Sequence, residues 1–215
     1  MPPFASRNAR THVLTVGALV TGLALAAAAC GASGSPAASG SSSPHPMTSH
    51  SHSMTHTASS VFGSDCGMMP TTGMGSLHGM SMDPVVTAAA HNPLLSDLAR
   101  AIKGAGLASG LDAMHMLTVF APADSAFSKL SSTTMTMMHS RAELTRILKY
   151  HVVSGHVTAA ELASGKPLTT LEGSTLKPSK MGAVYEVNSA DVICGGIQTA
   201  NATVYIINKV LVPAH

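Results

Sequence analysis

The sequence is poor in aromatic and charged residues. It contains no Trp, three Tyr and four Phe, and only 10% of its 215 residues are charged. Lys and Arg together number 12 and Asp and Glu together number 10, so the chain has no basic stripe. Because recognition of nucleic acids depends on clustered cations and stacking aromatic rings, this composition argues against a nucleic-acid partner.

Motifs that would support catalysis are also missing. The chain contains no G-x-S-x-G elbow, P-loop, H-E-x-x-H or C-x-x-C pattern. Its acidic residues are few, and no two form an obvious pair for general acid–base chemistry. The sequence therefore predicts a protein that is not an enzyme and that needs no cofactor for catalysis.

Residues 1–29 are expected to be a signal peptide of the lipoprotein type. Arg7 and Arg10 form a basic start, and the uncharged stretch 13–29 is rich in Ala, Leu, Val and Gly. Residues 27–31 read Ala-Ala-Ala-Cys-Gly, and small residues before a cysteine resemble a bacterial lipobox. We therefore expect Cys30 to carry a lipid that anchors the protein on the outer face of the cell membrane. The alternative is ordinary secretory cleavage, which gives a secreted or cell-wall protein.

Residues 30–64 are expected to be a disordered tether. Between 31 and 64 there is no Lys, Arg, Asp or Glu, and such a composition cannot build a hydrophobic core. Six residues of metal-ligand type fall within twelve positions: His45, Met47, His50, His52, Met54 and His56. Because imidazole suits Cu(II) and thioether suits Cu(I), the tether is a candidate copper site. The alternative is a low-complexity spacer that tolerates any uncharged residue.

A second run of histidine and methionine follows the tether. Its members are Met68, Met69, Met74, His78, Met80 and Met82. Some of these methionines are expected to enter the core, where an unbranched thioether fills irregular gaps.

The cysteine count is compatible with one disulfide. If Cys30 is lipidated, Cys66 and Cys194 remain as a pair, and an exported protein meets an oxidising environment. The bridge would close a loop of about 129 residues and would stabilise the fold by at most ~5 kcal/mol. The alternative is two free thiols.

Residues 65–215 are expected to form one folded domain. Helices are predicted at 82–90, 92–102, 107–115, 124–130, 140–149 and 158–163. Strands are predicted at 117–121, 150–153, 168–171, 174–177, 183–187, 191–194, 197–199 and 203–211, the last apolar on both faces. A Thr158/Glu161 capping box is expected, and Met135, Met137 and Met138 are expected to fill the core. Because helices come early and strands late, the predicted fold class is α+β.

The segment from Thr118 to Phe127 reads as a strand that runs directly into a helix. Pro122 is expected to end the strand, and Asp124 is expected to cap the helix. Two later segments accompany it: 150–153, with the sequence Tyr-His-Val-Val, and 200–213, which ends in proline.

These three segments together resemble the fasciclin (FAS1) domain, over roughly Cys66 to Pro213. The matching residues are Thr118, Phe120, Pro122, Asp124, Phe127, Tyr150, His151, Asn208, Leu211 and Pro213. The wider resemblance is to secreted and lipid-anchored single-FAS1 proteins of mycobacteria and other actinobacteria, which are similar at both paired cysteines. It implies a compact β-sandwich or wedge of short strands packed with several α-helices. Ala123 departs from the pattern, since many members carry Thr or Asn there.

The resemblance also implies a function in cell adhesion or in binding a protein or matrix partner at the cell surface. The Tyr150–His151 region has been linked to receptor binding in animal members of the family. We favour the other interpretation, in which His151 is a core histidine whose ring bonds a backbone group, because buried polar groups normally find partners. At the level of the whole protein, the alternative function is extracytoplasmic copper binding through the tether.

Overall fold

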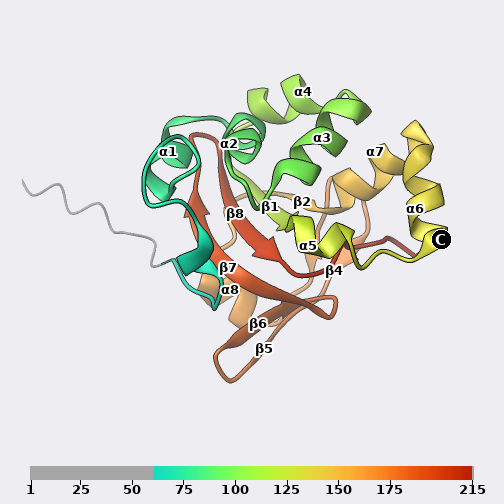
Figure 1. The fold of residues 1–215 in the computed structure, drawn as a ribbon. Coiled ribbons are helices and arrows are strands. Elements are labelled where there is room, and N and C mark those ends of the chain that lie inside the picture. The colour runs from blue at the N-terminus through green and yellow to red at the C-terminus, as the bar shows by residue number, and fades with distance from the viewer. Residues whose placement is uncertain (1–60, 215) are drawn as a thin grey trace, which may run out of the picture. The chain divides into compact units, whose positions relative to one another are not determined.

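The computed structural model describes residues 61–214. Helices dominate the first half of this part and cover one side of a sheet (Figure 1). They are η1 (a 3₁₀ turn, Cys66–Met68), α1 (Leu77–Met82), α2 (Val85–His91), α3 (Ser96–Ala105), α4 (Ala108–Ala113), α5 (Asp124–Phe127), α6 (Ser132–His139), α7 (Arg141–Tyr150) and α8 (Ala159–Ala163).

The strands form one mixed six-stranded sheet and a separate two-stranded sheet. They are β1 (Leu117–Pro122), β2 (Val152–Ser154), β3 (Leu168–Thr169), β4 (Thr175–Leu176), β5 (Pro178–Met181), β6 (Val184–Val187), β7 (Ala190–Gln198) and β8 (Ala202–Ile207). The order in the larger sheet is β2-β1-β8-β7-β6-β5, and β3 pairs with β4. Only the β1–β8 pairing is parallel among these strands. The predicted α+β class is confirmed.

The central strand β8 is buried along its whole length, as its apolar sequence predicted. Successive side chains of a strand point to opposite faces, and here they enter two different cores. Val204 and Ile206 join the cluster that the helices α2 and α3 cover. Tyr205 and Ile207 join the second cluster on the other face, where the Tyr205 ring stacks on Phe120 with centroids 5.7 Å apart.

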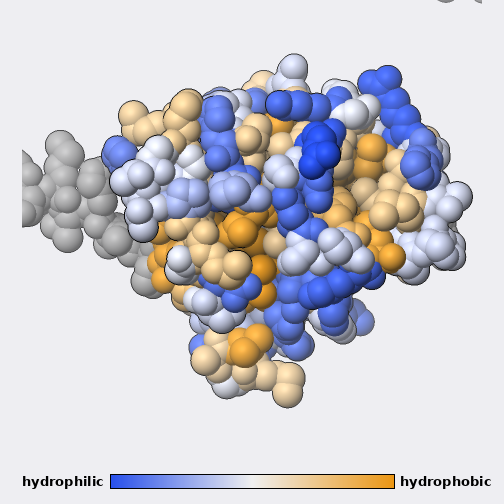
Figure 2. All heavy atoms as spheres, in the orientation of Figure 1, coloured by the Kyte–Doolittle hydropathy of each residue, from blue (hydrophilic) through white to orange (hydrophobic). Residues whose placement is uncertain are grey.

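The β5–β6 hairpin projects from the bottom of the view in Figure 1. Met181 and Val184 at its tip are 69% and 46% exposed. Figure 2 shows hydrophobic residues at this tip, and elsewhere on the same face hydrophobic residues reach the surface between hydrophilic ones.

Several predicted boundaries are wrong. The strand predicted at 117–121 is one residue longer: Pro122 is the last residue of β1 and pairs with Ile207, because a missing N–H is tolerated where a ladder ends. Tyr150 ends helix α7 and His151 is its C-cap, so neither residue belongs to a strand. Helix α1 and strand β5 were not predicted, whereas the capping box of Thr158 and Glu161 is confirmed at the start of α8.

The methionines of α6 were also placed wrongly in the core. Helix α6 buries none of its residues, and Met135 is 45% exposed. In the earlier His/Met run the prediction of partial burial is correct. Met69 and Met80 are buried, whereas Met68, Met74 and Met82 are exposed.

Candidate functional site

Three residues of the first motif are buried or half-buried in the domain. Thr118 is fully buried, and its Oγ1 donates to the carbonyl of Gly155 at 2.7 Å and accepts from the N–H of Val157 at 2.8 Å. Phe120 is fully buried in the second core, and Phe127 is half-buried against the first. These residues therefore act in folding rather than as a binding surface.

Asp124 does not cap its own helix. The N-cap of α5 is Ala123, without a side-chain hydrogen bond, and Asp124 is the first helical residue. The Asp124 carboxylate instead reaches α3, where Oδ1 accepts from the N–H of Asp97 at 2.9 Å and Oδ2 from the hydroxyl of Ser96 at 2.5 Å. Helix α3 has no side-chain cap from its own N-cap residue, so Asp124 supplies the missing acceptor.

His151 lies in the core, 2% exposed, between α7 and the C-terminal segment. Its Nδ1 lies 2.8 Å from the carbonyl of Ile147, and its Nε2 accepts from the N–H of Leu211 at 2.9 Å. Burial lowers the pKa of His151 to about 4, although the bond to the Ile147 carbonyl opposes this shift. The Tyr150 hydroxyl, whose pKa is raised by burial, donates to the carbonyl of Thr175 at 3.3 Å. In this geometry His151 has no free ring nitrogen for a partner.

The remaining motif residues close the C-terminal end of the domain. The Asn208 side chain bonds both the N–H and the carboxylate of Asp191, at 2.9 and 2.6 Å. Leu211 and Pro213 are buried. The predicted disulfide is present and joins Cys66 in η1 to Cys194 in β7. Cys30 and the six tether residues between His45 and His56 lie outside the described residues.

A surface cleft opens at the end of the sheet where β1 and β8 begin and β2 ends. It consists of two hollows of about 490 and 240 Å³ that share His156, Gln198 and Thr203. We call it the His156 cleft. The larger hollow adds His115 and Met116, and the smaller one adds Phe62, Thr158 and Tyr205, among others. None of the described residues that line either hollow is Lys, Arg, Asp or Glu.

Hydrogen bonds fix the polar side chains at the centre of the cleft. The Thr203 hydroxyl donates to Oε1 of Gln198 at 3.3 Å and lies 2.6 Å from Nδ1 of His156. Because that hydroxyl has a single proton and gives it to Gln198, Nδ1 of His156 is the donor in its contact with Thr203. The buried Tyr205 hydroxyl, whose pKa burial raises to about 12, donates to the carbonyl of Val157 at 2.6 Å.

Hydrogen bonds from the Asn201 side chain fix the loop that precedes β1 and forms one wall of the cleft. The Asn201 amide donates to the carbonyls of Leu111 and Met114 at 2.9 and 2.8 Å, and its oxygen accepts from the N–H of Val85 at 2.8 Å. The next turn holds Met116 at a φ of 56°, a conformation that is uncommon for a residue with a side chain. Such strain persists only where the surroundings fix it.

Sequence reasoning missed His115, Met116 and His156. The signal that could have found them is strand pairing, because β1 and β2 pair with Leu117 opposite Ser154. Continuing that register places Met116 opposite Gly155, whose N–H donates to the Met116 carbonyl at 2.7 Å. His115 precedes Met116 and His156 follows Gly155, so the two histidines lie at the same end of the β1–β2 pair.

Three further properties of residues 61–214 bear on function. No group of three or more His, Cys, Asp or Glu in this range is arranged to hold a metal ion. An apolar cavity inside the first core has a volume of only about 20 Å³, room for a water-sized molecule at most. Within the same range no helix is long and apolar enough to cross a bilayer.

Comparison with known proteins identifies the family. The fasciclin domain model matches residues 93–213. Immunogenic protein MPB70 of Mycobacterium bovis is 42% identical over 148 residues, which cover 66% of this chain and 75% of that protein. Cell surface glycolipoprotein MPB83 of the same species is 38% identical over 169 residues, covering 74% and 76%. The chain therefore belongs to the fasciclin domain family.

A solved structure confirms the fold. The FAS1 domain pair of the insect cell adhesion molecule fasciclin I superposes with a TM-score of 0.54 at 17% sequence identity. The match covers 63% of this chain and 52% of that two-domain chain. At this identity the likeness concerns the fold alone, and it agrees with the FAS1 fold that the motifs implied.

Proposed function

We propose that this protein is a non-enzymatic, lipid-anchored cell-surface protein whose fasciclin domain binds a protein or matrix partner and so mediates adhesion. Family membership supports a surface role, since MPB83 is named a cell surface glycolipoprotein. The solved structure with a similar fold comes from a protein named as a cell adhesion molecule, which is in keeping with the adhesive part of the proposal.

The observation that carries the proposal is the His156 cleft. It presents hydrogen-bonding groups from His156 and Gln198, whose positions the buried Thr203 hydroxyl fixes, without a charged residue in its described lining. A pre-organised set of hydrogen-bonding side chains suits a peptide backbone or a glycan hydroxyl, because little side-chain entropy is lost on binding. The Tyr150–His151 pair is unsuited to this task, since His151 is buried and both of its ring nitrogens are occupied.

The test is adhesion of cells that display the full chain. His156→Ala and Gln198→Ala are each expected to weaken attachment to the protein's natural surface by about tenfold. His139→Ala is the matched control, because His139 is exposed on α6 and does not line the cleft. Thermal unfolding of each variant separates lost contact from lost fold. Attachment equal to wild type in both stable cleft variants would place the contact elsewhere on the domain.

Lipid anchoring is tested separately at Cys30. Cys30→Ser is expected to release the protein into the medium, because acylation supplies the membrane affinity. Retention of this variant on the membrane at the wild-type level would contradict the anchor.

A second candidate function is copper binding by the tether. It rests on the six imidazole and thioether side chains between His45 and His56, whose chemistry suits both copper oxidation states. Calorimetry of a peptide covering 44–57 tests it, and affinity no better than that of a scrambled peptide would rule it out. Deleting residues 31–60 while keeping an anchor separates the two functions. Residues 61–64 are kept, because Phe62 lines the His156 cleft and pairs with Gly195. The deletion should leave an adhesive domain active where it can still reach its partner, and should abolish copper binding.

A further inference from the structure

Helix α1 and the turn before it present two thioethers and one imidazole to one surface hollow. Met74 and Met82 are 55% and 71% exposed, and His78 is exposed between them. All three line a hollow of about 500 Å³ together with Thr71, Thr72 and Asp83, among others. Isolated exposed apolar residues are normal on protein surfaces, but two thioethers and an imidazole gathered in one hollow are a ligand set.

The backbone brings Met74 closer to the other two residues than sequence spacing alone would. Met74 precedes α1, and the chain folds back so that a Cβ added at Gly79 would lie 2.5 Å from the Met74 Cα. Only glycine at position 79 permits this approach. His78 and Met82 are four residues apart on α1, so their side chains start from one face of the helix, with Cβ atoms about 6 Å apart. The backbone at Met74 therefore packs directly against α1 at Gly79, the neighbour of His78.

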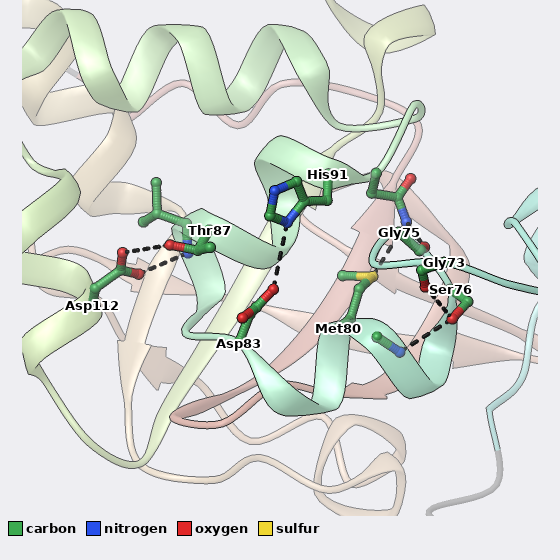
Figure 3. Close-up of polar contacts among 11 residues, drawn as sticks. Gly73, Gly75, Ser76, Met80, Asp83, Thr87, His91 and Asp112 are labelled. Atoms are coloured by element: carbon green, nitrogen blue, oxygen red, sulfur yellow. Dashed lines mark hydrogen bonds and ion pairs between the residues drawn. The ribbon is translucent and has the colours of Figure 1, made fainter.

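The opposite side of α1 is anchored, which leaves this face free and rigid. Figure 3 shows the contacts: the Ser76 hydroxyl caps the helix through the N–H of Gly79 at 3.1 Å and donates to the Gly73 carbonyl at 2.6 Å. Met80 is fully buried, and its sulfur accepts from the Asn92 amide at 3.2 Å. The same amide bonds the Gly75 carbonyl at 3.2 Å. The turn that carries Met74 is thus tied to both α1 and α2.

We propose that Met74, His78 and Met82 form a binding site for a soft monovalent cation, Cu(I) or its surrogate Ag(I). Thioether sulfur prefers such ions, and neutral imidazole completes a three-coordinate set. No Lys or Arg is among the described residues that line the hollow, so no fixed cation opposes binding. The site lies in the folded domain and is independent of both the His156 cleft and the tether.

The experiment titrates Ag(I) into the full mature chain with ¹³C-methyl-labelled methionine, which avoids a reductant that would open the disulfide. The methyl resonances of Met74 and Met82 are expected to shift together and to saturate with the same equivalent of silver. The double variant Met74→Leu/Met82→Leu keeps side-chain volume. The double variant is expected to bind this one equivalent of Ag(I) at least about tenfold more weakly than wild type does.

Met181→Leu is the matched control, because Met181 is 69% exposed on β5 and lies outside the hollow. It should bind silver as wild type does, and both variants should melt at the wild-type temperature within a few degrees. The tether is present in every sample, so its own ligands contribute equally. Unshifted Met74 and Met82 signals, or an unchanged number of tight equivalents in the double variant, would overturn the proposal.

Discussion

The Nε2 atom of His151 accepts a hydrogen bond from the backbone N–H of Leu211 at 2.9 Å, across 60 positions of sequence. Because Nε2 is the acceptor, the ring proton must be on Nδ1, which donates to the Ile147 carbonyl. One neutral imidazole therefore links helix α7 to the C-terminal segment. A second proton would face the Leu211 N–H and break the link.

The stability of the domain should therefore depend on the protonation of His151. The pKa of this histidine is about 4 when folded and about 6.5 when unfolded, so in that window the unfolded chain binds more protons. The free energy of unfolding is expected to fall by roughly 3 kcal/mol as pH is lowered through the window. Urea unfolding from pH 7 to 4 measures it. His151→Gln should flatten the slope, and equal slopes in the two proteins would refute the assignment.

The Cys66–Cys194 bridge should be a large contributor to stability. It joins positions 128 residues apart and ties the N-terminal turn η1 to strand β7. Replacing both cysteines by alanine is expected to lower the free energy of unfolding by about 4 kcal/mol, chiefly because the unfolded chain gains freedom. Urea unfolding of wild type and variant gives the difference. A variant with the wild-type midpoint would show that the loop closure contributes little.

Asp124 should stabilise α3 rather than α5. Asp124→Ala leaves the Asp97 N–H and the Ser96 hydroxyl without an acceptor, and a loss of about 2 kcal/mol is expected. Asp124→Asn keeps one oxygen for the Asp97 N–H and should cost less. Hydrogen exchange of the first-turn amides of α3 locates the effect. Ser125→Ala, at an exposed neighbour, is the control, and an equal loss in both alanine variants would contradict the cap.

The sequence sufficed for the α+β class, the motif segments and the disulfide, because these depend on local patterning or on a count of cysteines. It failed where the side chain that caps a helix comes from a residue far away in the sequence. Asp124 caps α3 from 27 positions away, and Asp112 accepts from the N–H of Val86 in α2 across 26 positions. A rule that searches for caps next to a helix cannot find these residues.

The candidate site was missed for a related reason. His115 and His156 come together only because β1 pairs with β2, and the sequence does not state which strands pair. His151 was singled out because its motif is local, and the interpretation of it as a core histidine bonded to the backbone is confirmed. Likewise, the close approach of Gly79 to Met74 depends on a chain reversal that the predicted helix at 82–90 did not include.

Asn201 offers the sharpest test of how the fold shapes the His156 cleft. Its amide donates to the Leu111 and Met114 carbonyls, while its oxygen accepts from the Val85 N–H. Asn201→Asp replaces the donor by a carboxylate oxygen of nearly the same size, which faces two carbonyl oxygens in a site that is 8% exposed. A loss of roughly 3 kcal/mol in the free energy of unfolding is expected, with faster hydrogen exchange at 111–116.

Asn188→Asp is the matched control for this substitution. The Asn188 amide donates to the Tyr150 hydroxyl at 2.7 Å, and a hydroxyl can turn to donate to a carboxylate instead. Its oxygen still accepts from the Lys177 N–H, so a much smaller loss is expected. Equal destabilisation by the two substitutions would mean that the carbonyls around Asn201 do not depend on its amide. Attachment in the adhesion assay should weaken in Asn201→Asp and not in Asn188→Asp, because only the first loosens the wall of the cleft.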